Sequence, residues 1–180
     1  AVVLCAMLDA SKETTAPTYT NRPGKLVNGK DANEDNAADA VAALQSEFRE
    51  YDVWDTQRAY TSSKLGTAVG GQGFAYMISD RVFGALPSEK VTNFNHLKPG
   101  DLVYFNSDGQ YAVVTSVSGN TFNYVYCNGF GIISWRGSGR IDNLTSRDAV
   151  YTRYEGEPTD VLANGDDATE KNVLSLLDDL

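Results

Sequence analysis

The chain has 180 residues, of which 42% are hydrophobic and 22% charged, and this is enough to bury one hydrophobic core. Its net charge is −9 and it contains no run of Lys or Arg. Binding to nucleic-acid phosphates or to an anionic membrane surface needs clustered positive charge, so neither partner is expected.

The first 25 residues differ in composition from the rest. Residues 1–8 (AVVLCAML) are apolar or small, and a polar stretch rich in Ser, Thr and Pro follows them. Eight residues are too few to cross a bilayer, but they match the end of the apolar region of a signal peptide. We therefore interpret 1–25 as a signal remnant and linker, and expect a secreted or cell-surface protein without a membrane span in the mature chain. A buried N-terminal strand is the alternative.

Two segments of the chain resemble each other. LVNGKDANEDNAADAVAAL at 26–44 and LANGDDATEKNVLSLLDDL at 162–180 share eight of nineteen residues. This favours a folded module over 26–158, then a linker and the first helix of a truncated second copy over 159–180, with further modules in the same polypeptide. Chance similarity between two short helices is the alternative.

Helical patterns come first along the module. A helix is expected over 33–50, with Asn33 as its N-cap and an apolar face made by Ala37, Val41, Leu44 and Phe48. A glycine-rich loop precedes a second helix over 72–83, whose apolar spacing is set by Phe74, Met77, Ile78 and Val82.

Strand patterns follow. Short segments rich in Val, Tyr and Phe, joined by Asn and Gly turns, predict strands over 101–105, 111–117, 121–127, 131–135 and 148–154. Helices followed by strands indicate an α+β fold, with N-terminal helices packed on a C-terminal antiparallel meander.

Five of these segments carry a family resemblance: GGQGFAYMISDRVFG, LKPGDLVYF, GQYAVVTSV, YVYCNGFGIISW and YTRYEGEP. Together they resemble the papain-like cell-wall cysteine amidases and endopeptidases of the NlpC and CHAP type, and most of all a tandem-module version from secreted proteins of Gram-positive gut bacteria. The resemblance covers about 26–156 and implies a papain-like fold. In that family a Cys before Gly-Phe-Ala is the nucleophile, a His that begins a strand is the base, and a polar residue on the next strand orients the His.

The resemblance places those three catalytic positions on Gly71, Gln110 and Asn128. Glycine supplies no thiolate, and a Gln amide takes up no proton at neutral pH. Loss of the nucleophile in a comparable triad costs roughly 10⁶-fold in turnover. The module is therefore expected not to hydrolyse amides by the family's route.

Other residues do not replace the missing groups. His96, the only histidine, is expected in a loop, and Cys127 is expected to be a small buried residue without a disulfide. One histidine and scattered acids predict no metal site, and no cofactor is expected. Aromatic and amide side chains are candidates for binding a substrate in the remaining groove: Gln72, Tyr111, Tyr126 and Trp135.

The resemblance thus implies a catalytically inactive relative that binds peptidoglycan peptide or another cell-surface glycan or peptide, or that spaces active neighbours. Two alternatives stay open. Catalysis could lie in a following module that begins at Leu162, or the chain could be a purely structural or adhesive surface domain.

Overall fold

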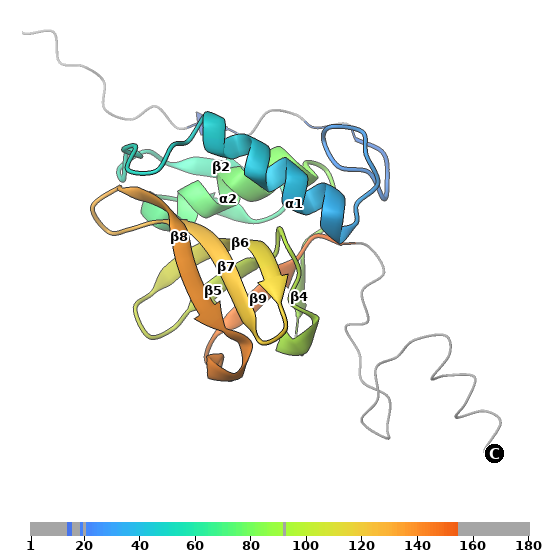
Figure 1. Cartoon of the computed structure of the whole chain (residues 1–180). Helices are drawn as coiled ribbons and strands as arrows, with labels where there is room; N and C mark the ends of the chain where they lie inside the picture. Colours follow the sequence, from blue (N-terminus) through green and yellow to red (C-terminus); the bar gives the residue numbers. More distant parts are fainter. Residues whose placement is uncertain (1–13, 16–18, 20, 92, 155–180) are drawn as a thin grey trace, which may run out of the picture.

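Two α-helices lie against one face of a curled six-stranded sheet (Figure 1). The computed structural model describes residues 14–15, 19, 21–91 and 93–154. The helices are α1 (Glu34–Ala43) and α2 (Gly70–Phe83), and the short 3-10 helices are η1 (Leu44–Ser46), η2 (Phe94–His96) and η3 (Ile141–Asn143). This arrangement confirms the expected α+β class.

The six-stranded sheet is antiparallel throughout, with the order β4-β9-β5-β6-β7-β8. Four consecutive strands form a meander: β5 (Leu102–Phe105), β6 (Gln110–Ser118), β7 (Thr121–Cys127) and β8 (Ile133–Arg140). The chain then returns as β9 (Ala149–Thr152), which lies between β5 and β4 (Glu89–Val91). The predicted strands are present, although β8 begins and ends later than expected, and β4 was not predicted.

A second sheet, also unpredicted, covers the other side of α2. It contains β1 (Thr14–Thr15), β2 (Tyr60–Ser62) and β3 (Gly66–Ala68). Because α2 contacts both this sheet and the large one, every residue from Gly73 to Asp80 is buried, including the polar Ser79 and Asp80. The apolar face predicted for this helix is buried, as expected, but the opposite face is buried too.

The first helix is shorter than its pattern predicts. Asn33 caps it as expected, since its side-chain oxygen accepts a hydrogen bond from the Asn36 amide at 2.9 Å. The helical turns end at Ser46, so the prediction of helix over 47–50 is wrong. The amides of Tyr51 and Trp54 instead donate to Ile133 and Gly131, at 2.9 and 2.7 Å, and tie this segment to the start of β8.

Apolar side chains pack on both faces of the large sheet. One cluster lies between the helices and the sheet and includes Ala37, Val41, Leu44 and all four apolar residues predicted for the second helix. A smaller cluster lies on the opposite face, where Val103, Val114, Phe122 and Val150 contact residues of the loops that contain η2 and η3. Each face of the sheet therefore has its own core.

The ends of the module lie partly outside the described residues. Asn21 joins the folded unit, because its side chain donates to the Phe83 carbonyl at 3.0 Å and accepts from the Ala85 amide at 2.7 Å. The signal remnant at 1–8 and the second module copy at 159–180 lie outside the described residues and stay predictions. Neither α1 nor α2, the helices of the described ranges, has the length and apolar character needed to cross a bilayer.

Candidate functional site

A cavity of about 280 Å³ opens at the start of α2 and contains all three positions implied by the family resemblance. Gly71 comes from the first turn of α2, Gln110 from the start of β6, and Asn128 from the turn after β7. The other lining residues are Val69, Gln72, Asp108, Gly109, Tyr111 and Gly129. The fold thus brings together the three implied positions, of which Gly71 and Asn128 are 57 positions apart in the chain (128 − 71).

The backbone of β7 fills the space beside Gly71. A Cβ atom added at Gly71 would overlap the carbonyl oxygen of Cys127, the last residue of β7. The start of α2 therefore approaches the sheet more closely than any side chain at position 71 permits. The backbone angle φ of Gly71 is not positive, so its backbone conformation does not require a glycine. Packing against the Cys127 carbonyl does.

Gln110 is directed to the same carbonyl. Its side-chain nitrogen donates a hydrogen bond to the Cys127 oxygen at 3.3 Å. The positions implied for nucleophile and base therefore meet at one backbone oxygen, an acceptor that has no nucleophilic chemistry of its own.

Asn128 serves the hairpin between β7 and β8. Its side-chain oxygen accepts hydrogen bonds from the amides of Phe130 and Ile132, both at 3.0 Å. Asn128 thus stabilises the turn that forms one wall of the cavity, an Asx-type role. Its hydrogen bonds in the structure do not include one to Gln110.

Two of the four residues expected to bind a substrate line the cavity. Gln72 donates to the hydroxyl of Tyr76 at 2.8 Å, one turn later on α2. Tyr111 also lines the cavity, and burial raises its pKa to about 12, so the phenol stays protonated as a hydrogen-bond donor at neutral pH.

The other two candidates lie elsewhere. The indole nitrogen of Trp135 donates to the Phe48 carbonyl at 2.6 Å, and the ring packs on the main core. Tyr126 neighbours Tyr124 on β7, with ring centroids 5.7 Å apart, and is not part of the cavity lining. Trp135 thus anchors the segment after η1.

Neither Cys127 nor His96 is placed to act in this cavity. Cys127 is 2% exposed, its sulfur contacts the Asn128 carbonyl oxygen at 3.6 Å, and burial raises its thiol pKa to about 11. A thiolate nucleophile needs the opposite shift. His96 lies in η2, outside the lining residues.

The remaining ionisable groups offer hydrogen bonds only. Asp108 is the one carboxylate that lines the cavity, and its side chain accepts a hydrogen bond from the backbone amide of Gln110 at 3.2 Å. Across the residues that the structure describes, no three His, Cys, Asp or Glu side chains gather in a way that could hold a metal ion. Sequence reasoning missed Asp108 and Val69 as lining residues, although the Asn-Ser-Asp-Gly turn before β6 was visible.

Comparisons of the chain with protein-family models, with curated proteins and with solved structures find no match.

Proposed function

We propose that this chain is a non-hydrolysing, papain-like module of a secreted or cell-surface protein, which binds peptidoglycan peptide in the cavity at the start of α2. The observation that supports it best is the position of the Cys127 carbonyl oxygen. It occupies the space that a side chain at position 71 would need, and it accepts a hydrogen bond from Gln110. The cavity is therefore present, but it contains no pair of a nucleophile and a base.

The groups that line the cavity suit recognition of a peptide. Side-chain amides of Gln72, Gln110 and Asn128 and the phenol of Tyr111 offer both donors and acceptors for a peptide backbone. No side chain caps the N-terminus of α2, so the amides of its first turn are available to a carboxylate of the ligand.

Exposed apolar side chains lie beside this polar cavity. Val69 lines it and is 55% exposed, and Phe130 follows Gly129 in the adjacent turn and is 89% exposed. Val53, 75% exposed, pairs with Ile132 of the same turn. Apolar groups next to amides fit a peptide that carries short aliphatic side chains.

The test uses purified muropeptides with the whole chain. Mass spectrometry is expected to show intact muropeptides after prolonged incubation, and NMR titration is expected to shift the amide signals of Gly71, Gln72 and Gly129. Gln110→Ala should weaken binding by about fivefold to tenfold, the effect of one lost hydrogen bond. Gln57→Ala, at an exposed position outside the cavity, is the matched control.

Two outcomes would overturn the proposal. Cleavage of the muropeptides would show an active enzyme. A lack of any shift with millimolar muropeptide would favour a structural or adhesive domain.

A further inference from the structure

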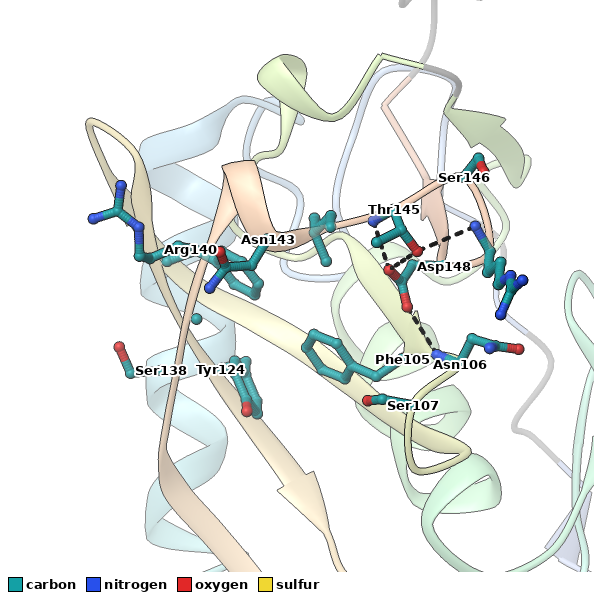
Figure 2. A pocket seen from close by; sticks show the side chains of 14 residues that line it. Phe105, Asn106, Ser107, Tyr124, Ser138, Arg140, Asn143, Thr145, Ser146 and Asp148 are labelled. Atoms are coloured by element: carbon teal, nitrogen blue, oxygen red, sulfur yellow. Dashed lines mark hydrogen bonds between the residues drawn. The ribbon is translucent and has the colours of Figure 1, made fainter.

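A second, larger cavity of about 540 Å³ lies on the opposite face of the large sheet (Figure 2). Its floor belongs to β5 and β7 and its walls to the β5–β6 turn, to the end of β8 and to the loop from Asn143 to Asp148. It shares no lining residue with the cavity at the start of α2. A ligand in this second cavity is therefore independent of the proposed function.

Three aromatic rings form the floor. Phe105 and Phe122 are nearly parallel, with ring centroids 6.3 Å apart and 9° between the planes. Tyr124 is 5.2 Å from Phe105 and 5.7 Å from Phe122. Phe122 is buried, whereas Phe105 and Tyr124 are half-buried and offer ring surface to the cavity.

Two glycines of β8 make room for these rings. A Cβ atom at Gly137 would overlap the ring of Tyr124, and one at Gly139 would lie 2.8 Å from the Cζ atom of Phe122. Residues two apart on a strand share a face, so β8 presents no side chain on this face across both positions. The rings therefore lie against bare backbone, and the hollow stays open above them.

Asp148 fastens the opposite wall. Its carboxylate accepts hydrogen bonds from the Thr145 amide at 2.7 Å, the Thr145 hydroxyl at 2.9 Å and the Asn106 amide at 2.8 Å (Figure 2). Partial burial works to raise its pKa, but the amides of Thr145 and Asn106 keep the pKa of Asp148 below its ordinary value. The wall is thus held in place before any ligand binds.

The rim above the rings is polar and largely uncharged. Hydroxyl and amide side chains surround the opening: Asn106, Ser107, Asn143, Thr145 and Ser146. The one lining carboxylate, Asp148, is occupied by three hydrogen bonds. Arg140 makes two bonds to Asp142, at 2.9 and 2.7 Å, which leaves Arg147 as the remaining charged group of the lining.

We propose that this cavity binds a neutral oligosaccharide. Sugar rings have apolar C–H faces that pack on aromatic rings, and their hydroxyl groups need the many small donors and acceptors that the rim provides. The volume lies within the range of small-molecule sites. An anion would need more positive charge than Arg147 offers, because Arg140 is already paired.

The experiment is an NMR titration of the whole chain with tetra-N-acetylchitotetraose and with cellotetraose, both uncharged. At least one of them is expected to shift the amide signals of Asn106, Gly139 and Thr145 while those of Gly71 and Gln72 stay unchanged. Tyr124→Leu should weaken binding by about tenfold, because a stacking surface is lost. Tyr126→Leu is the matched control, since Tyr126 is on the same strand and outside the lining.

A second variant, Asn143→Ala, removes a rim amide without touching the core and should weaken binding about fivefold. It keeps the proposal testable if Tyr124→Leu does not fold. The proposal is overturned if neither oligosaccharide shifts these signals at millimolar concentration, or if inorganic phosphate shifts them and the sugars do not. Shifts at Gly71 alone would likewise overturn it while supporting a ligand in the other cavity.

Discussion

Arg153 and Asp80 form an ion pair of 2.9 Å in which each side chain is only 1% exposed. Arg153 follows the last strand, and Asp80 lies in the last turn of α2. The guanidinium also donates to the carbonyls of Gly84 and Leu86, at 2.6 and 2.8 Å. Arg153, which follows β9 of the large sheet, therefore caps the C-terminus of α2.

The same carboxylate connects the small sheet to this helix. Tyr60 and Ser62 of β2 donate their hydroxyls to Asp80 at 3.1 and 2.9 Å. One buried acid thus links β2, α2 and the chain after β9. A buried charge with this many partners is costly to leave alone.

We predict that Arg153→Leu lowers the free energy of unfolding by about 3–5 kcal/mol, because it leaves the Asp80 charge buried without its cation. Denaturation with urea measures this. Arg140→Leu is the control, since it breaks an exposed pair with Asp142 and should leave the unfolding midpoint almost unchanged. Equal losses of unfolding free energy in the two variants would contradict the prediction, because they would show that the buried Arg153–Asp80 pair stabilises the fold no more than an exposed pair does.

A methyl group at position 71 should also be costly. Gly71→Ala forces the start of α2 away from the Cys127 carbonyl, and we expect a loss of about 1–3 kcal/mol in stability. Gly129→Ala is the matched control in the same cavity, because a Cβ atom there meets nothing within 4 Å. A thermal melt of both variants measures the difference, and a harmless Gly71→Ala would remove the packing argument made for this site.

The thiol of Cys127 should be nearly inert in the folded protein. Its pKa is about 11 against an ordinary value of 9.0, so the thiolate fraction at pH 8 falls by about a hundredfold before shielding is counted. The measurement is reaction with Ellman's reagent in a Cys5→Ser background, with and without denaturant. A fast native reaction would mean that Cys127 is accessible and reopen the question of a nucleophile.

Stability should decrease in alkali. The folded state keeps Cys127 and Tyr111 protonated up to pKa values of about 11 and about 12, whereas the unfolded chain loses these protons near 9.0 and 10.0. Their contribution is therefore complete below about pH 9 and is lost as pH rises through 11 to 12. Cys127→Ala should flatten the decline between pH 9 and 11 in a series of urea titrations. If Cys127→Ala leaves the slope of stability against pH unchanged, the decline between pH 9 and 11 is not due to Cys127.

Repeating patterns in the sequence were enough to predict most elements of the fold. The helix at 70–83 and the strands β5, β6 and β7 have clear periods and bounding turns, so their positions were found to within two residues. The strands β2, β3 and β4 contain three residues each, too few to show a period. The segment 47–50 continues a helical pattern but is not helical. The amides of Tyr51 and Trp54, which follow it, bond to the carbonyls of Ile133 in β8 and of Gly131 in the turn before β8.

The candidate site was predictable only as a set of positions. The resemblance brought Gly71, Gln110 and Asn128 to attention, and the fold does gather them around one cavity. The sequence did not predict the large cavity on the other face. The role of Gly137 and Gly139 there depends on aromatic rings of the neighbouring strand, which the sequence does not place beside them. Trp135 is a reasonable groove residue by type, but its ring packs against the main core, and its indole nitrogen bonds to the carbonyl of Phe48, 87 residues away.

By itself the sequence determined the two helices and the five longer strands that follow them, the cap at Asn33, and the lack of a thiol and an imidazole at two positions. These are local properties, set by side-chain type and by periods that a short window displays. Only the tertiary structure decided that the Cys127 carbonyl fills the space beside Gly71, that Arg153 neutralises Asp80, and that the sheet has a hollow on its second face. Such contacts join residues far apart in the chain, and they exist only once both faces of the sheet are packed.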